Sequence, residues 1–354
     1  MTVRCGDTLL FQTLPVIAAG AAVGGKKESE GPLAAEFDEL SADNRFGQSS
    51  WEAAEKYLQL RAARLCLQKA ALPQEKVQLA LAGDLQAQCT ASSYAMRELG
   101  VPFAGLFGAC STMAEGLALG AALCEGGAAR NLLAMASSAG MAAGLLAMTS
   151  SHFCAAERQF RTPLSYGAVR TPTAQWTATA AGCCLLQPQG EGVGIAAATF
   201  GRVQDYQVKD INNMGAAMAP AAASTLLHYF KDTGTEPQEF DCIYTGDLGQ
   251  VGSQLLRELL AAEGLLIKNH VDCGCILFDA NEQSVKSGGS GPGCCASVLC
   301  GHILPRLEKG TQKRVLFIAT GALMSQTTFL QKESIPAIAH LVELRSPQQK
   351  EENG

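Results

Sequence analysis

The chain carries the same strand-helix pattern twice, and this duplication limits the folds that are open to it. An apolar strand at 77–85 and another at 240–248 both end in Gly-Asp-Leu, and a helix follows each of them. Both helices stop at a glycine, the residue that most easily takes the left-handed conformation at a helix end. The two strand ends lie 163 residues apart (246 − 83). We therefore expect two similar halves.

A second repeated unit follows in the same order. A helix of small residues that begins at Cys110 leads into an apolar strand at 130–138, and a helix at 294–307 leads into a strand at 314–322. These copies lie 183 residues apart (317 − 134), about 20 more than the first pair. We assign the extra residues to a hairpin-like insertion at 275–289, which has polar turn residues in its middle.

The strand of the first copy has two candidates. The segment LLAMASS at 132–138 recurs as LLAMTSS at 145–151, an offset of 13 residues. The sequence alone does not decide which of the two enters the sheet. The choice matters because it moves His152 relative to any site.

Each half alternates buried strands with helices, an order typical of mainly parallel sheets with helical crossovers. The chain has 354 residues, of which 47% are hydrophobic, enough for a large core. We therefore predict an α/β fold made of an N-terminal half at 1–190 and a C-terminal half at 191–346. The polar segment at 347–354 is expected to be a disordered tail.

Charge and cysteine content exclude several functions. The net charge is −6 and no basic patch is present, which argues against nucleic acid as a partner. The 14 cysteines show neither a disulfide framework nor zinc-finger spacing, so we expect free thiols and no metal site. No segment has the length of a membrane span and no signal peptide is evident, so we expect synthesis in the cytoplasm.

Cys110 is the residue best placed for chemistry. The apolar run at 103–107 predicts a buried strand, and Cys110 stands between that strand and the next helix. The free N–H groups and the dipole at a helix start would lower the pKa of its thiol or hold an anion beside it. The alternative is a small buried residue selected for close packing.

Three further polar side chains of the first half could face the same pocket. His152 follows a strand and could be a hydrogen-bond donor, a base or a buried structural residue. Arg158 and Arg161 could each bind a carboxylate through two hydrogen bonds, or could pair with Glu157.

The second half offers acidic residues and glycines at matching places. Asp247 and its counterpart Asp84 end equivalent strands and could hold a calcium ion, or could cap the helices that follow them. His270 and Asp272 could serve either the site or a turn. The glycines between 288 and 293 could bring backbone N–H groups to an anion, or could permit tight packing.

This duplicated arrangement, with a cysteine at the start of the central helix of the first half, resembles the thiolase and ketoacyl synthase superfamily. The resemblance covers almost the whole chain and implies an α-β-α-β-α layered, thiolase-like fold that is usually dimeric. In that superfamily the cysteine attacks an acyl thioester, while His and Asn, or two His, from two loops of the second half stabilise the oxyanion and move protons. The corresponding loops here hold Thr245-Gly246-Asp247 and Gly288 to Gly293, with neither His nor Asn.

A closer resemblance is to the stage V sporulation protein AD family of spore-forming bacteria. The segments that carry it include EGPLAAEFD at 30–38, LFGACST at 106–112, MGAAMAPAAA at 214–223, YTGDLGQVGS at 244–253 and QKESIPAIAHLVEL at 331–344. It implies a protein that binds pyridine-2,6-dicarboxylate (dipicolinic acid), alone or with calcium. It also implies other stage V sporulation membrane proteins as partners, which would place the chain peripherally at the forespore or spore inner membrane and support uptake of the compound.

We therefore expect a homodimer that binds this ligand in the former substrate cleft, without enzymatic activity and without a cofactor of its own. The residues expected to bind the ligand are Cys110, Ser111, His152, Arg158, Arg161, Gly246, Asp247, His270, Asp272, Ser290 and Gly291. Two other functions stay open: an active acyltransferase of the ketoacyl synthase type that uses Cys110, and a scaffold with a vestigial pocket.

Overall fold

The computed structural model describes residues 2–128, 143–162 and 167–347. Its strands are β1 (Val3–Cys5), β2 (Thr8–Leu10), β3 (Val16–Gly24), β4 (Glu39–Leu40), β5 (Val77–Gly83), β6 (Phe103–Gly105), β7 (Gly144–Ser151), β8 (Trp176–Thr177), β9 (Ala180–Gln187), β10 (Val193–Thr199), β11 (Cys242–Thr245), β12 (His270–Asp272), β13 (Gly289–Ser290), β14 (Arg314–Ala322) and β15 (Ala337–Arg345). Its α-helices are α1 (Lys26–Ser29), α2 (Trp51–Lys69), α3 (Thr90–Leu99), α4 (Thr112–Glu125), α5 (Phe153–Arg161), α6 (Met214–Thr233), α7 (Gly249–Ala262), α8 (Cys273–Leu277), α9 (Pro292–Val298), α10 (Leu304–Glu308) and α11 (Gln326–Leu330).

The main sheet joins two groups of strands that share one order and one set of directions. The order is β3-β9-β7-β5-β6 in the first group and β10-β15-β14-β11-β12 in the second. In each group the outer strands pair in parallel, and the strands nearer the middle pair antiparallel. β3 and β10 pair with each other where the groups meet. The topology confirms the duplicated strand-helix halves.

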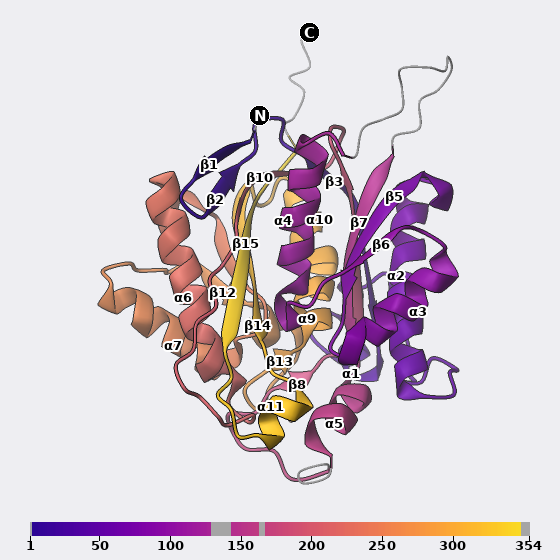
Figure 1. Cartoon of the computed structure of the whole chain (residues 1–354), viewed down its shortest axis with the longest axis vertical. Coiled ribbons are helices and arrows are strands. Elements are labelled where there is room, and N and C mark those ends of the chain that lie inside the picture. Colours follow the sequence, from indigo (N-terminus) through magenta and orange to yellow (C-terminus); the bar gives the residue numbers. More distant parts are fainter. Residues whose placement is uncertain (1, 129–142, 163–166, 348–354) are drawn as a thin grey trace.

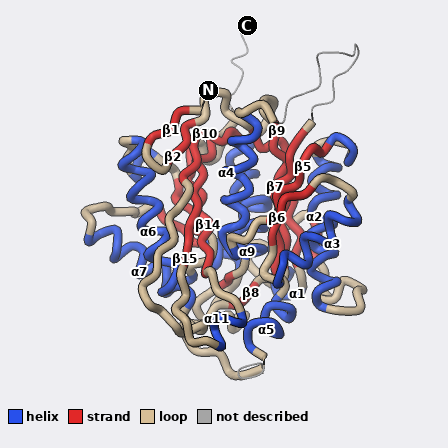
Figure 2. The backbone as a smooth tube through the Cα atoms, in the orientation of Figure 1, coloured by secondary structure: helices blue, strands red, loops and turns tan. Residues whose placement is uncertain are grey.

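The helices form layers on both sides of the strands and between them. Figure 1 shows α4 and α9 between the two groups of strands, with α2 and α3 outside the first group and α6 and α7 outside the second. Figure 2 shows the same alternation of helix and strand across the molecule. The predicted α/β class with its α-β-α-β-α layers is confirmed.

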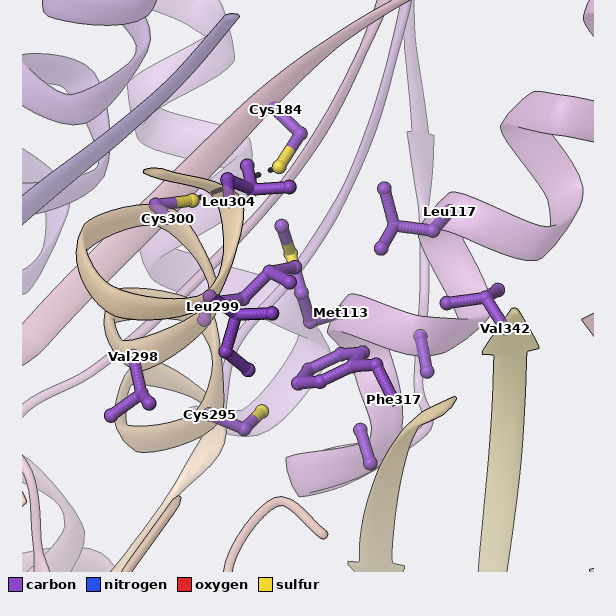
Figure 3. Packing of buried hydrophobic residues seen from close by; sticks show 14 of the residues in the cluster. Met113, Leu117, Cys184, Cys295, Val298, Leu299, Cys300, Leu304, Phe317 and Val342 are labelled. Atoms are coloured by element: carbon purple, nitrogen blue, oxygen red, sulfur yellow. Dashed lines mark hydrogen bonds between the residues drawn. The ribbon is translucent and has the colours of Figure 1, made fainter. Parts of the chain in front are cut away.

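The central layer is filled by apolar and sulfur-containing side chains. Figure 3 shows Met113 of α4 close to Leu299 and Phe317, which come from the second half. The Sγ atoms of Cys184 and Cys300 lie 3.7 Å apart within the same cluster. All fourteen cysteines lie in the described ranges and are free. The two central helices are thereby packed against strands of both halves.

The structure decides which copy of the repeated LLAM segment enters the sheet. β7 (Gly144–Ser151) contains the second copy. The first copy, with the strand predicted at 130–138, lies outside the described residues. In the register of the sheet, Leu146 and Leu316 are now equivalent, and the offset is 170 residues (316 − 146) rather than 183.

The predicted hairpin at 275–289 is wrong. Cys273–Leu277 forms α8, and Gly289–Ser290 forms β13, which pairs in parallel with β8 of the first half. The error follows from the choice of the first LLAM copy, which made the second half too long by comparison. The segment links the two halves instead of forming a local hairpin.

The run at 103–107 is also not the buried strand that its composition predicts. β6 covers Phe103–Gly105 at the edge of the sheet, and Phe107 is 67% exposed. Within the described residues, β6 has a neighbour only on its β5 side. Apolar composition therefore marks an uncovered surface here.

The division into halves at 190 and 191 stays a prediction. β9 ends at Gln187 and β10 begins at Val193, so that boundary falls in the loop between them. Of the predicted tail at 347–354, only its first residue lies in the described ranges.

Close backbone contacts seat the central helices, and they can be tested at glycine. A Cβ on Gly182 would lie 2.4 Å from the backbone oxygen of Ala296 in α9, whereas a Cβ on Gly120 would meet the flexible end of Leu186 at 2.9 Å. We expect Gly182→Ala to lower the free energy of unfolding by about 1–3 kcal/mol, since backbone cannot move aside. Gly120→Ala should stay within about 1 kcal/mol of wild type, because Ala also favours the helix. Chemical denaturation measures both, and equal losses would contradict this account.

Candidate functional site

One cavity lies at the end of the molecule where parallel strands of both halves finish. Its volume is about 460 Å³, and its walls come from the loops after β5 and β6, from α5, from β8 and β13, from the first turns of α6 and from α11. Figure 1 shows α5, α11, β8 and β13 gathered at this end. The carboxyl ends of parallel strands are the edge at which α/β proteins usually bind ligands. Cys110 lies in the cavity wall.

Cys110 stands in a tight turn that joins β6 to α4. Ala109 has a φ of +50°, a left-handed conformation that is uncommon for a residue with a side chain. Ser111 donates to the carbonyl oxygen of Gly108 through its backbone N–H (3.0 Å) and its hydroxyl (2.7 Å). Gly321 of β14 lies so close that a Cβ there would come within 2.1 Å of the same oxygen. Ser111 is fully buried and holds the turn instead of lining the cavity.

The environment of Cys110 favours the neutral thiol. Its side chain is buried, and this burial raises its pKa well above the usual value for cysteine. The negative charge of Asp247 and a hydrogen bond to it raise the pKa further, while the Gly291 N–H lowers it. The expectation that the helix start lowers the pKa of Cys110 is therefore wrong, because burial and the carboxylate outweigh the helix dipole.

Asp247 is fully buried behind Cys110 and Ser290, which line the cavity. The Thr320 hydroxyl donates to its Oδ1 at 2.6 Å, and the Ser290 hydroxyl donates to its Oδ2 at 3.3 Å. Burial raises the pKa of Asp247 to about 7, although its hydrogen bonds lower it in part. This carboxyl therefore changes its charge near neutral pH.

Gly246 and Gly291 allow the close packing of this cluster because they have no side chain. A Cβ on Gly246 would lie 3.1 Å from the Cβ of Cys295 in α9. Gly291 has a φ of +92°, and a Cβ there would lie 2.6 Å from the Ser151 Oγ. The structure thus brings Cys110, Asp247, Ser290 and Gly291 together, with Gly246 directly beside them.

Two arginines share one carboxylate in the part of the cavity wall that comes from α5 and from the segment before β8. Arg161 Nε lies 2.9 Å from Glu157 Oε1, and Arg170 also contacts this oxygen. Arg161 donates to the Asn212 side chain at 2.9 Å, and Arg170 donates to the backbone oxygen of Gln175 at 2.6 Å. Burial lowers the pKa of Arg170. Two guanidinium groups against one carboxylate leave this wall with an excess positive charge.

Arg170 is the functional candidate that the sequence analysis missed. It stands in an irregular segment before β8, where no strand end or helix start marks it. Its neighbours Gln175 and Thr177 also line the cavity. The nitrogen of the Gln175 side chain donates to the backbone oxygens of Asp247 and Gly289, which leaves its buried Oε1 without a hydrogen-bond partner.

Arg158 lies outside this cavity, although it was expected to bind the ligand. It forms an ion pair with Glu52 and borders a smaller neighbouring cavity of about 300 Å³. Its side chain is 54% exposed. On α5 it lies three residues from Arg161, but its ion pair is with Glu52 and not with Glu157.

His152 is also outside the cavity. It is fully buried, its Nε2 lies 2.8 Å from the Asn44 backbone oxygen, and its Nδ1 accepts the Cys154 N–H at 3.2 Å as the N-cap of α5. Burial lowers its pKa. It comes directly after β7, so its place follows from the entry of the second LLAM copy into the sheet.

His270 and Asp272 belong to the support of the neighbouring loop. The Asp272 carboxylate accepts the Leu248 and Gly249 N–H groups, each at 2.9 Å, and the Thr245 hydroxyl at 2.6 Å. His270 Nε2 lies 2.8 Å from the same hydroxyl. Neither residue lines the cavity. They fix the segment that carries Asp247.

Asp84 lines the cavity but its carboxylate is engaged. It accepts the backbone N–H groups of Gln86 and Ser92, each at 2.8 Å, and the Ser92 hydroxyl at 2.6 Å. Burial raises the pKa of Asp84 and of its neighbour Glu55. Within the described ranges, no group of three or more His, Cys, Asp or Glu side chains is arranged to hold a metal ion.

Comparison with known proteins identifies the family. The family model for stage V sporulation protein AD matches residues 5–345. The chain belongs to the stage V sporulation protein AD family. The stage V sporulation protein AD of Bacillus subtilis (strain 168) is 40% identical over 335 residues, which cover 94% of this chain and 95% of that protein. This member of the stage V sporulation protein AD family is therefore a sporulation protein.

Solved structures of thiolase-like proteins share the fold of this chain. Cerulenin-bound OleA of Xanthomonas campestris is 16% identical with a TM-score of 0.59, over 97% of this chain and 99% of that one. The 3-oxoacyl-[acyl-carrier-protein] synthase III of Aquifex aeolicus is 11% identical with a TM-score of 0.55, over 94% and 99%. At these identities the likeness shows the thiolase-like fold alone. Within the described residues, no helix has the length and apolar character needed to span a membrane.

The neutral state of Cys110 has a direct chemical test. We expect iodoacetamide at pH 7.5 to label Cys5, which is partly exposed, at least ten times faster than Cys110. Asp247→Asn should speed labelling of Cys110, because it removes a nearby negative charge, but burial should keep the rate below that of Cys5. Peptide mass spectrometry measures both rates, with Glu263→Gln as a control on an exposed carboxylate. Fast labelling of wild-type Cys110 would contradict the assignment.

Proposed function

We propose that the chain binds pyridine-2,6-dicarboxylate in the cavity beside Cys110. The observation that carries this proposal is the excess positive charge of Arg161 and Arg170 around Glu157, set in a mostly apolar cavity. Guanidinium groups bind carboxylates through paired hydrogen bonds. Membership in a sporulation family agrees with a ligand of the spore.

The remaining walls suit an aromatic ring. Phe160, Ile211, Met214 and Met218 line the cavity together with the arginines and Cys110. A volume of about 460 Å³ lies within the range of small-molecule sites, roughly 300–1,000 Å³. One carboxylate of the ligand would meet the two guanidinium groups, and the other would lie toward Ser290 and Cys110.

A Cys110-dependent acyltransferase has weaker support. Acyl transfer needs a thiolate or a base beside the thiol, and positive or neutral donors beside the oxyanion. Cys110 instead has a raised pKa and the Asp247 carboxyl as its neighbour. Within the described residues, no histidine lines the cavity. A stable acyl adduct on Cys110 after incubation with acyl thioesters would reverse this preference.

In this proposal a calcium ion would bind as part of the ligand complex and not as a resident metal of the protein.

We further propose that the chain acts beside stage V sporulation membrane proteins at the forespore membrane. The uncovered edge strand β6 and the exposed Phe107 support a homodimer that pairs along this edge.

Arginine substitutions on α5 and before β8 test where the ligand binds. Isothermal calorimetry with pyridine-2,6-dicarboxylate should show saturable binding to the wild-type chain and at least a tenfold weaker affinity for Arg170→Gln, because a charge-assisted bond is lost. The matched control is Arg158→Gln, which removes an arginine from the neighbouring ion pair with Glu52 and should leave affinity within about twofold. Absence of binding to wild type would reject the proposed function. Equal losses in both variants would reject the assigned cavity.

The charge of Asp247 predicts how binding depends on pH. Its pKa of about 7 means that the carboxyl is mostly neutral at pH 6 and mostly charged at pH 8, so a bound anion is repelled at the higher pH. We expect the affinity for the free dicarboxylate to fall about tenfold between pH 6 and pH 8, and Asp247→Asn to remove most of this slope. Asp272, with a pKa of about 6, contributes in the same direction, while His270, with a pKa of about 4, stays neutral. A higher affinity at pH 8 than at pH 6, measured without calcium, would contradict the prediction.

A further inference from the structure

Arg170 is held against a pair of stacked aromatic rings. The rings of Phe153 and Trp176 lie 3.7 Å apart with an interplanar angle of 6°. The Arg170 guanidinium carbon lies 4.9 Å from the centre of the Phe153 ring and 5.0 Å from the centre of the Trp176 ring. Because the rings are stacked face to face, a guanidinium at nearly equal distances from both centres lies at the edges of the stack, where it packs against the rings without covering a ring face. Arg170 lines the cavity, whereas the lining includes neither ring.

Trp176 is itself fixed from several sides. The Lys27 ammonium lies 4.4 Å from the centre of its ring and donates to the Gln283 backbone oxygen at 2.7 Å. The backbone N–H of Trp176 donates to the Gly288 oxygen at 2.8 Å, and β8 pairs with β13 at Gly289. The ring is therefore part of the rigid strand pair that also carries Ser290.

The two rings limit the orientations that the Arg170 side chain can take beside the Glu157 carboxylate. Arg170 and Arg161 both contact Glu157, so an unsupported Arg170 side chain could turn fully onto this carboxylate and present no hydrogen-bond donors to a ligand. A long arginine side chain also loses conformational freedom when it is ordered. An aromatic surface beside the guanidinium, together with the Gln175 oxygen at 2.6 Å, limits its orientations before any ligand arrives.

We propose that Trp176 is a positioning residue of the anion site, which with Phe153 orients the Arg170 guanidinium for a carboxylate ligand. The part of this inference that concerns the ligand rests on the proposed function. The part that concerns the orientation of Arg170 holds for the free protein and can be tested without a ligand.

The chain provides a matched control in its other tryptophan. Trp51 also has an arginine over its ring, with the Arg45 guanidinium carbon 4.2 Å from the ring centre, but neither residue lines the cavity. The sequence contains two tryptophans, so these two positions include every residue of this type. Loss of an arginine–tryptophan contact can therefore be compared inside and outside the site.

The first measurement uses the free full-length chain. The Nε–H resonance of Arg170, identified by its loss in Arg170→Gln, should be sharp and displaced by the ring currents of the aromatic pair. Trp176→Leu should move it toward the position of an unstructured arginine, and Trp176→Phe should keep most of the displacement. A resonance that Trp176→Leu leaves in place would overturn the proposal, whatever the ligand result.

The second measurement is the affinity for pyridine-2,6-dicarboxylate with the thermal midpoint recorded for each variant. We expect Trp176→Leu to weaken binding about tenfold, Trp176→Phe to restore it to within about threefold, and Trp51→Leu to leave it unchanged. If the loss of affinity is proportional to the loss of thermal midpoint in all three variants, Trp176 has a purely structural role and the proposal is overturned. If the wild type does not bind, the proposed function fails, while the resonance still decides the orientation of Arg170.

Discussion

The close approach of backbone between the central helices and the strands that flank them is the constraint on which the rest depends. Gly182 meets α9 at the Ala296 oxygen, and a Cβ on Gly293 would lie 2.2 Å from the Ala180 oxygen. Gly321 meets the turn before Cys110 in the same way. Larger residues at these places would push the halves apart. Because the halves meet so closely, residues more than a hundred positions apart in sequence form one cavity wall.

This packing also explains why a cysteine at a helix start does not have to be a nucleophile. A helix dipole acts over the first turn and weakens with exposure to solvent. Cys110 lies in a buried wall with the Asp247 carboxyl behind it, so desolvation and charge act together in the opposite direction. The duplicated fold provides the position, and the neighbouring residues decide its chemistry. Here they favour a neutral thiol in the cavity wall.

Much of the fold could be predicted from the sequence because the pattern is repeated. The strands that end in Gly-Asp-Leu became β5 and β11, and Gly100 ends α3 in the left-handed conformation. What failed depended on tertiary context. Two nearly identical LLAM segments have equal strand propensity, so only packing could select between them. The sequence of an apolar edge strand is similar to that of a buried strand, and only the neighbours in the fold distinguish the two.

The candidate site was predicted in part, for a related physical reason. Cys110, Asp247 and Ser290 lie at strand ends or in the turns between a strand and a helix, and the order of strands brings such positions together. Arg158 and Arg161 are three residues apart on α5 and lie on neighbouring parts of its surface, yet only Arg161 lines the main cavity. Their partners separate them, because Arg158 pairs with Glu52 and Arg161 pairs with Glu157. Arg170 comes from an irregular segment whose path is set by its contacts with Glu157, Phe153 and Trp176. No local sequence pattern predicts its place in the cavity.

The most direct measurement of the central claim is a crystal structure of the full chain grown with pyridine-2,6-dicarboxylate. The account predicts the ligand in the cavity beside Cys110, with one carboxylate within hydrogen-bond distance of Arg170 and Arg161 and no bond to the cysteine sulfur. A ligand that occupies the neighbouring cavity at Arg158, or a cavity that stays empty at saturating ligand, would contradict it.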